Sequence, residues 1–519
     1  MSAVTITAAP MSVDELLAVV DGATVELAPD ALATIEASRA VVSRALASGK
    51  PIYGVSTHVG HGKDVRLTQD ELRGQQEFLV MTHSGGFGPP LPTALVRAAI
   101  AVRLNGIARG GSGASPAAAN VLVAMLNAGI HPIVASVTSV GAADLGPMAG
   151  IAQVAIGRGT ADYGGQTLTG GEALHRAGIA PLVLEPKDGI ALISANGVSI
   201  GHAALVIARA AEVAAAADVS AALSMEATHA NTSIILAVVA AAKPFPGQIE
   251  AAAHLRDILA GSHLLDSSAA PSVQDALSFR VVPQVHGALR DYIAYARRAV
   301  EVELNSASDN PLVSVPDQAI VSNGNFHPMV LAIAFDALRV AIAHVGQLSE
   351  RRMSHLWDAF FTLMSGGGPP PNESPPPLFG VHLRYPAAAL FPELKQLAAP
   401  ATLDTPSVDM GVEDHGTSAP LSVRKTEEAL GLLDDLLVIE LLLARDVLSM
   451  MLARPALGSG TAHALQAVEE AIASCEPSPA AVHQAVRATT LDRSGRAGDA
   501  RPVRDRAATT TCSSGRRTY

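Results

Sequence analysis

Side chains suited to proton transfer and charge recognition lie far apart along this chain. Tyr53 lies in a loop between Pro51 and Gly54. A phenol has an unperturbed pKa of about 10, so a basic role needs a shifted pKa or a transient phenolate. The guanidinium of Arg280 offers the planar fork that a carboxylate binds, and the acidic group of Glu413 can bind an amine or an imidazolium. Each could instead be structural, as a packed phenol or an ion pair, but the loop position of Tyr53 favours a functional role.

Two further patterns could indicate ligand sites. His58 and His61 have H-x-x-H spacing, and Asp64 follows, so the loop offers three potential metal ligands. Isolated histidines on loops are common, and we predict no metal here. The glycine-rich segment 110–113 lacks the preceding strand and the following Lys of a phosphate-binding P-loop. We therefore expect neither a metal nor a P-loop.

The composition limits the class of protein. The chain has 519 residues, of which 49% are apolar, and a net charge of −12, which argues against nucleic acid or an anionic membrane as the main partner. Its two cysteines, Cys475 and Cys512, are too few and too far apart for a disulfide framework. The first ten residues lack a basic segment followed by an apolar run, so we expect no signal peptide and a cytoplasmic location.

Apolar periodicity predicts the elements that position these residues. Over 201–227, 327–353 and 426–454 apolar residues recur every three to four positions, which indicates a bundle of long helices. A shorter helix is predicted to begin after Ser115 and to end at Gly129. We expect an N-terminal region over 1–200, the bundle and C-terminal helices over 201–490, and a disordered tail over 491–519, which is rich in Arg, Ser, Thr and Gly.

A series of collinear segments, in the same order, resembles motifs of the histidine/phenylalanine ammonia-lyase family. One such match would be weak, but the series spans roughly residues 50–425 and is a strong signal. The segments are PIYGVST (51–57), THSGG (82–86), GGSG (110–113), LNAGIHP (126–132), KDGIALI (187–193), VQDALSFRVVPQVHG (273–287), ELNSASDNP (303–311), GNFH (324–327) and EDH (413–415).

The segment 138–149 resembles the part of the family that forms its cofactor, S-V-G-A-S-G-D-L-A-P-L-A. In the family, Ala-Ser-Gly cyclises into the electrophile 4-methylidene-imidazole-5-one (MIO). This chain has Ala142-Ala143-Asp144 there, is one residue shorter, and has no Ser between Gly141 and Leu145. Because the methylidene carbon comes from the serine side chain, the electrophile cannot form by the family's route. We expect no MIO and no other cofactor.

The resemblance also implies roles for individual residues. It implies that Tyr53 removes the β-proton of a substrate and that Arg280 holds the substrate carboxylate. Glu413 would lie near the substrate amine or side chain, and with the Thr82-His83 pair it is more similar to histidine lyases than to phenylalanine lyases. Further expected pocket residues are Gln274, Asn310 and Phe326.

The departures from the family cluster on groups that build and support MIO. Leu277 stands where the family has a tyrosine, and Phe78 where it has an asparagine. The family's N-G-T becomes Ser194-Ala195-Asn196-Gly197, so either Ser194 or Asn196 could face the pocket. These changes, beside a retained Tyr53, favour a pocket that works without MIO.

The resemblance implies an all-α fold, a long-helix bundle of the fumarase/aspartase-like type, and a homotetramer whose active sites combine residues of several subunits. The expected ligand is an amino acid or an unsaturated carboxylic acid. The first functional hypothesis is a MIO-independent enzyme with Tyr53 as general base, for elimination, addition, isomerisation or cyclisation. The alternatives are a conventional histidine or aromatic amino acid ammonia-lyase and a non-catalytic ligand-binding homologue.

Overall fold

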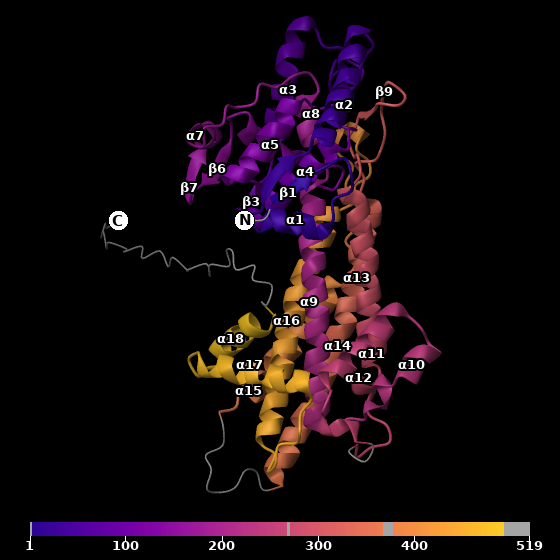
Figure 1. Ribbon diagram of the computed structural model, residues 1–519, viewed down its shortest axis with the longest axis vertical. Coiled ribbons are helices and arrows are strands. Elements are labelled where there is room, and N and C mark those ends of the chain that lie inside the picture. The colour runs from indigo at the N-terminus through magenta and orange to yellow at the C-terminus, as the bar shows by residue number, and fades with distance from the viewer. Residues whose placement is uncertain (1–2, 267–269, 367–376, 492–519) are drawn as a thin grey trace, which may run out of the picture.

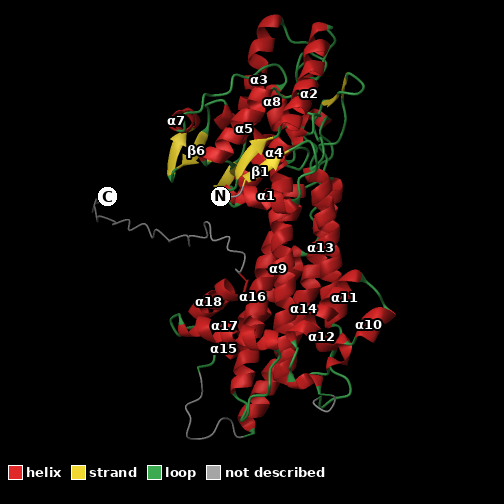
Figure 2. Cartoon of the chain, in the orientation of Figure 1, coloured by secondary structure: helices red, strands yellow, loops and turns green. Residues whose placement is uncertain are grey.

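The architecture is an elongated bundle of helices with a compact part at one end (Figure 1). It comes from a computed structural model that describes residues 3–266, 270–366 and 377–491. The fold is 63% helical, and its strands are short and confined mostly to the compact end, as Figure 2 shows. The predicted all-α class is therefore confirmed. Leu491 ends the last helix, and the rest of the predicted 491–519 tail lies outside the described residues.

The compact end is built from short helices and small sheets. Strands β1 and β2 pair in parallel, β3 pairs with β5, and β4-β6-β7 form an antiparallel sheet. Its elements are β1 (Ala3–Ile6), α1 (Val13–Val20), β2 (Thr24–Leu27), α2 (Pro29–Ala47), η1 (Gly60–Gly62), α3 (Gln69–His83), β3 (Phe87–Pro90), α4 (Thr93–Ala108), α5 (Pro116–Ala128), β4 (Ile130–Pro132), β5 (Ala135–Val137), α6 (Leu145–Ala155), β6 (Thr160–Tyr163), β7 (Gln166–Thr169), α7 (Gly170–Arg176) and α8 (Asp188–Ile193).

Helix α5 shows how local sequence sets an element's ends. The Ser115 hydroxyl accepts a hydrogen bond from the Ala118 amide at 3.2 Å, and Pro116 occupies the first turn, where its missing N–H costs nothing. Gly129 ends the helix in the left-handed conformation, with φ of 71°. Both predicted ends of this helix are confirmed.

Long helices form the rest of the molecule. The spans predicted over 201–227, 327–353 and 426–454 are present as α9 (Gly197–Thr228), α14 (Met329–Ser365) and α16 (Ala419–Ser449), and α13 (Val282–Leu304) packs with them. Fully buried leucines and isoleucines, among them Ile207, Leu338 and Leu437, fill the space between these helices. The boundary expected between residues 200 and 201 lies inside the first turn of α9.

The remaining elements are smaller. They are η2 (Thr232–Ile235), α10 (Ala237–Ala242), α11 (Pro246–Ile258), η3 (His263–Leu265), α12 (Leu277–Arg280), β8 (Leu312–Ser314), β9 (Ala319–Val321), α15 (Gly380–Leu397), η4 (Asp409–Gly411), α17 (Ser459–Ala473) and α18 (Pro479–Leu491). Of these, β8, β9 and η4 lie at the compact end, where β8 and β9 pack on α2 and η4 packs on η1 (Figure 1). Helix α12 lies in the lower part of the view, far from the compact end (Figure 1).

Two apolar stretches, Asp188–Thr228 and Met329–Ser365, are long enough to cross a membrane by length and composition. Within them, 89% and 61% of the most apolar window is buried inside the fold. That burial is what core helices of a bundle show.

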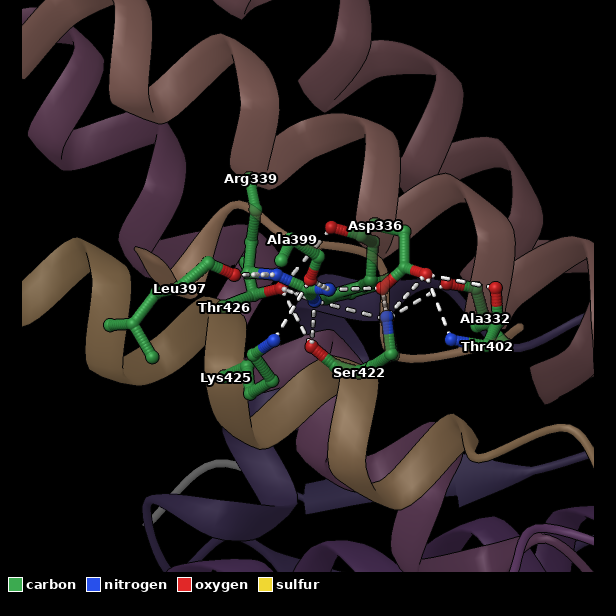
Figure 3. A network of polar contacts seen from close by, with 11 residues as sticks. Ala332, Asp336, Arg339, Leu397, Ala399, Thr402, Ser422, Lys425 and Thr426 are labelled. Carbon is green, nitrogen blue, oxygen red and sulfur yellow. Dashed lines mark hydrogen bonds and ion pairs between the residues drawn. The ribbon is translucent and has the colours of Figure 1, made fainter. Parts of the chain in front are cut away.

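A buried polar network ties α14 to α16 and to the segment that follows α15 (Figure 3). Arg339 donates to the carbonyl oxygens of Leu397 at 2.8 Å and Ser422 at 2.6 Å. Asp336 accepts from the Thr402 amide at 3.1 Å and from the Thr402 hydroxyl at 2.8 Å. The network thereby anchors the start of the loop that carries η4 and Glu413 to the bundle.

Candidate active site

A cavity of about 820 Å³ lies in the compact end. It is bounded by α3, α8, the loop after Tyr53, the segment at 142–145 and the loop that carries η4. Apolar and ionisable side chains from these distant segments share its wall. The lining residues used below are Tyr53, His58, Gly60, His61, Phe78, His83, Ala142, Ala143, Ser194, Asn310, Phe326, Asp409 and Glu413.

The hydroxyl of Tyr53 accepts a hydrogen bond from the Gly60 amide at 3.0 Å. Burial raises the pKa of Tyr53, the Gly60 hydrogen bond lowers it, and the carboxylates of Glu413 and Asp409 raise it further, for a net upward shift. The phenol of the isolated chain is thus protonated at neutral pH. The Gly60 N–H nevertheless points at the oxygen where a phenolate charge would form, which favours that form.

Carboxyl and imidazole groups lie along the same wall. Burial raises the pKa of Glu413, Asp409 adds to the rise, and His83 opposes it. The Nδ1 atom of His83 lies 2.8 Å from the Leu79 carbonyl oxygen, so this nitrogen carries the proton and Nε2 is the acceptor of the neutral ring. This wall can therefore bind an amine or an imidazole by hydrogen bonds and charge.

The segment 142–144 is a tight turn in which Ala143 has a left-handed φ of 55°, and hydrogen bonds to distant parts of the chain hold it. The Ala143 amide donates to the Phe326 carbonyl and the Asp144 amide to the Ala195 carbonyl, both at 2.9 Å. The carboxylate of Asp144 is fully buried and accepts from the Ser199 amide at 2.7 Å and the Ser139 hydroxyl at 2.9 Å. Only methyl groups, from Ala142 and Ala143, extend from this turn into the cavity wall.

The structure distinguishes Ser194 from Asn196. Ser194 lines the cavity, and its hydroxyl accepts a hydrogen bond from the backbone N–H of Asn310 at 3.4 Å. Asn196 is buried and does not line the cavity; its side chain donates to the Phe326 carbonyl at 3.0 Å. The expectation that Asn196 contacts the substrate is corrected to a supporting role behind Phe326. Helix α8 ends at Ile193 and α9 begins at Gly197, so Ser194 caps the first helix and Asn196 precedes the second.

The predicted residues fall into two groups. Tyr53, His83, Ser194, Asn310, Phe326 and Glu413 line one cavity. Arg280 and Gln274 do not line it within one chain. Arg280 ends α12 and Gln274 is exposed in the loop before it, towards the far end of the bundle (Figure 1). The length of the bundle keeps these two residues apart from the cavity unless another subunit supplies them.

The histidines of the Tyr53 loop have a different partner from the one that the H-x-x-H spacing suggests. His61 Nδ1 lies 2.9 Å from Asp409 Oδ1, while Asp64 pairs with Lys63 at 3.4 Å. Among the described residues, no group of three or more His, Cys, Asp or Glu side chains could hold a metal. Asp409 was missed in the sequence because it belongs to no motif and reaches the site only through the tertiary fold.

Comparison with known proteins places this geometry in a family. The model of the aromatic amino acid lyases matches residues 11–470. The chain belongs to the aromatic amino acid lyase family. A histidine ammonia-lyase of Myxococcus xanthus is 36% identical over 466 residues, which cover 88% of this chain and 90% of the relative.

Solved structures of family members have the same fold. The ergothioneine-degrading enzyme of Treponema denticola, solved with desmethyl-ergothioneine sulfonic acid, superposes with a TM-score of 0.88 at 26% identity, covering 94% of this chain and 99% of that one. A tyrosine aminomutase of Streptomyces globisporus gives a TM-score of 0.84 at 29% identity, covering 94% and 97%. The likeness extends over nearly the whole of each chain, so the expected ammonia-lyase bundle is confirmed.

Proposed function

We propose that this lyase-family chain is an enzyme that works without MIO, with Tyr53 as general base. Family members normally carry MIO. The residues present do not fit that group. The Ala142-Ala143-Asp144 turn has no side-chain hydroxyl to lose as water, and the one polar side chain, Asp144, is buried and bonded to Ser199 and Ser139. This turn is the observation that carries the proposal.

The substrate in this proposal is an amino acid or an unsaturated carboxylic acid. Tyr53 takes or returns a proton at carbon, with the Gly60 N–H stabilising its oxygen. Glu413 and His83 hold the amine or imidazole part. Elimination, addition, isomerisation and cyclisation all need this combination of a base and a charge clamp.

The substrate carboxylate in this proposal is bound by Arg280 of another subunit, with Gln274 beside it. An isolated chain holds the base and the carboxylate clamp in different places, so the enzyme would be an oligomer, which we propose is a homotetramer. We also propose a cytoplasmic location, as expected from the sequence. Leu277, where the family has a tyrosine, is 57% exposed beside Arg280 and would enter the same shared site.

Two alternatives come from specific observations. The relatives named histidine ammonia-lyase support a conventional histidine or aromatic amino acid ammonia-lyase. The intact subunit mass separates this alternative from the proposal, since cyclisation loses water and an uncyclised chain has its encoded mass. A non-catalytic ligand-binding homologue would keep the cavity but would not need Tyr53 with a donor at its oxygen.

Proton NMR in deuterated buffer tests the proposal. The panel consists of histidine, phenylalanine, tyrosine, their deaminated acids and ergothioneine, which the T. denticola relative degrades. Amine release or deuterium uptake at the β-carbon, lost in Tyr53→Phe, is expected for at least one compound. Turnover that survives in Tyr53→Phe would contradict Tyr53 as the base, and ligand binding with no turnover of any compound would favour the non-catalytic homologue.

A further inference from the structure

The hydrogen-bond donor to Tyr53 belongs to a loop, and a residue from a distant part of the chain holds this loop in place. The donor is the Gly60 amide, 3.0 Å from the phenol oxygen, in the short turn η1. Within the loop, His58 N bonds to the Val65 carbonyl and Gly62 N to the Val59 carbonyl, each at 3.1 Å. These bonds shape the loop locally but do not attach it to the cavity wall.

The attachment comes from Asp409, at the start of η4. Its Oδ2 accepts from the His61 amide at 3.1 Å, and its Oδ1 lies 2.9 Å from His61 Nδ1. The fit is close: a Cβ atom on residue 60 would lie 2.2 Å from Oδ2, and Gly60 has φ of 59°. Only glycine therefore allows the carboxylate to approach the loop so closely.

Asp409 is itself held in an uncommon conformation. Its φ is 49° and that of Met410 is 54°, in the left-handed region that non-glycine residues rarely adopt. The reciprocal bonds between Val408 and Glu413, whose amides each donate to the other's carbonyl, close the hairpin around them. The hairpin thus presents Asp409 to the Tyr53 loop and Glu413 to the cavity.

We propose that Asp409 is a positioning residue, which holds the 58–62 loop so that the Gly60 N–H stays on the phenol oxygen of Tyr53. It acts through the loop and not on the substrate. The inference deepens the proposed function, since it describes how the base is prepared for proton transfer. It assigns a task to a residue outside every family motif of the sequence.

Asp409 has a second, opposing effect on the phenol. Its negative charge raises the pKa of Tyr53, as does Glu413, while Lys63 lowers it. His58, His61 and His83 also line the cavity. The test must therefore separate the charge of residue 409 from its hydrogen bonds.

Titration of Tyr53 in the substrate-free, full-length protein makes this separation. Phenolate absorbance near 295 nm is recorded against pH for each protein. The titration curve of the same protein with Tyr53→Phe added is then subtracted, which removes the absorbance of the other tyrosines. Asp409→Asn removes the charge but keeps an oxygen for the His61 amide, and suits the positive φ. Asp409→Gly also suits that φ but removes both the charge and the acceptor.

We expect the pKa of Tyr53 in Asp409→Asn to lie below that of the unmodified protein, and the pKa in Asp409→Gly to lie above that of Asp409→Asn. Hydrogen exchange of the 58–63 peptide should be about fivefold faster in Asp409→Gly for each hydrogen bond of about 1 kcal/mol lost, and unchanged in Asp409→Asn. Asp414→Gly, on an exposed residue of the same loop, is the matched control and should leave both readouts unchanged.

Equal pKa values for the two Asp409 variants would mean that residue 409 acts through charge alone and would overturn the proposal. Unchanged exchange in Asp409→Gly would overturn it as well. Neither measurement uses a substrate, so the result is independent of whether Tyr53 proves to be the base in the NMR experiment.

Discussion

At the scale of single residues, the cavity combines a phenol and its backbone donor with two carboxylates and three imidazoles, beside a turn that contributes only methyl groups. The donor at Tyr53 is what distinguishes it from a packed phenol. The turn at 142–144 has no serine, and its one polar side chain is the buried carboxylate of Asp144, which accepts hydrogen bonds from Ser139 and Ser199. In the proposed function, chemistry at this site therefore depends on proton transfer and charge.

The first prediction concerns Tyr53→Phe. Loss of a general base costs about 10² to 10⁴ in rate, so we expect kcat to fall by that factor while the fold and the melting temperature stay close to those of the parent. Steady-state kinetics with a substrate found by the NMR panel, together with circular dichroism, measures both. Tyr163→Phe, on strand β6 away from the cavity, is the matched control and should keep full activity.

At the scale of elements, buried charge networks hold the long helices together. Asp218 of α9 is fully buried and contacts His254 of α11 at 2.8 Å, and His286 and Arg290 of α13, both at 2.7 Å. Burial would raise the pKa of Asp218, but the hydrogen bonds of both histidines and the charges of His286 and Arg290 lower it to about 2. The folded state therefore favours the ionised carboxylate.

The second prediction follows from that shift. An unfolded Asp has a pKa of about 3.9, so the stability contributed by Asp218 is present above about pH 4 and is lost as the pH falls towards about 2. Asp218→Asn breaks a buried pair and should lower the free energy of unfolding at pH 7 by about 3 to 5 kcal/mol. Urea unfolding followed by circular dichroism, repeated at decreasing pH, measures the difference.

The difference between Asp218→Asn and the parent should shrink below pH 4, because protonated Asp218 then resembles the asparagine. A difference that stays constant from pH 7 to pH 3 would contradict the assigned shift. Asp291→Asn on α13, whose carboxylate accepts from the Gly247 amide at 2.8 Å, serves as a control without a histidine partner.

At the scale of the whole molecule, the length of the bundle separates the residues that one reaction would need. Tyr53 and Glu413 belong to the compact end, and Arg280 lies towards the other end of the long helices (Figure 1). One chain cannot bring them together. A site shared between subunits would do so, as we propose for a homotetramer.

The third prediction tests that shared site by complementation. Arg280→Met removes a charged hydrogen-bond donor, and we expect weaker binding of a carboxylate ligand by about tenfold to a hundredfold. Tyr53→Phe and Arg280→Met should each be nearly inactive alone. Mixed tetramers refolded or co-expressed from both should regain activity, since about a quarter of randomly assembled two-subunit sites would contain both unmodified residues.

Light scattering should give a tetramer for each variant, so that any loss reflects the site and not the assembly. No recovery in the mixture, with mixed tetramers confirmed by mass, would contradict a site shared between Tyr53 and Arg280. Unchanged ligand affinity in Arg280→Met would contradict its role as the carboxylate clamp.

Local sequence determined the helices and the family. Apolar periodicity over 201–227, 327–353 and 426–454 predicted α9, α14 and α16, because a helix buries one stripe of residues at regular spacing whatever the rest of the fold. The ends of α5 followed from Ser115 and Gly129, whose effects act within one turn. The missing serine at 142–144 is equally a property of the sequence alone.

Tertiary structure decided which residues meet. His61 and Asp409 are 348 positions apart, and no spacing rule predicts their contact. The end of α8 decided that Ser194, and not Asn196, lines the cavity. The long bundle decided that Arg280 lies away from Tyr53 within one chain. Helix periods and caps are set by neighbouring residues, whereas an active site is set by how complete elements pack, which no local pattern records.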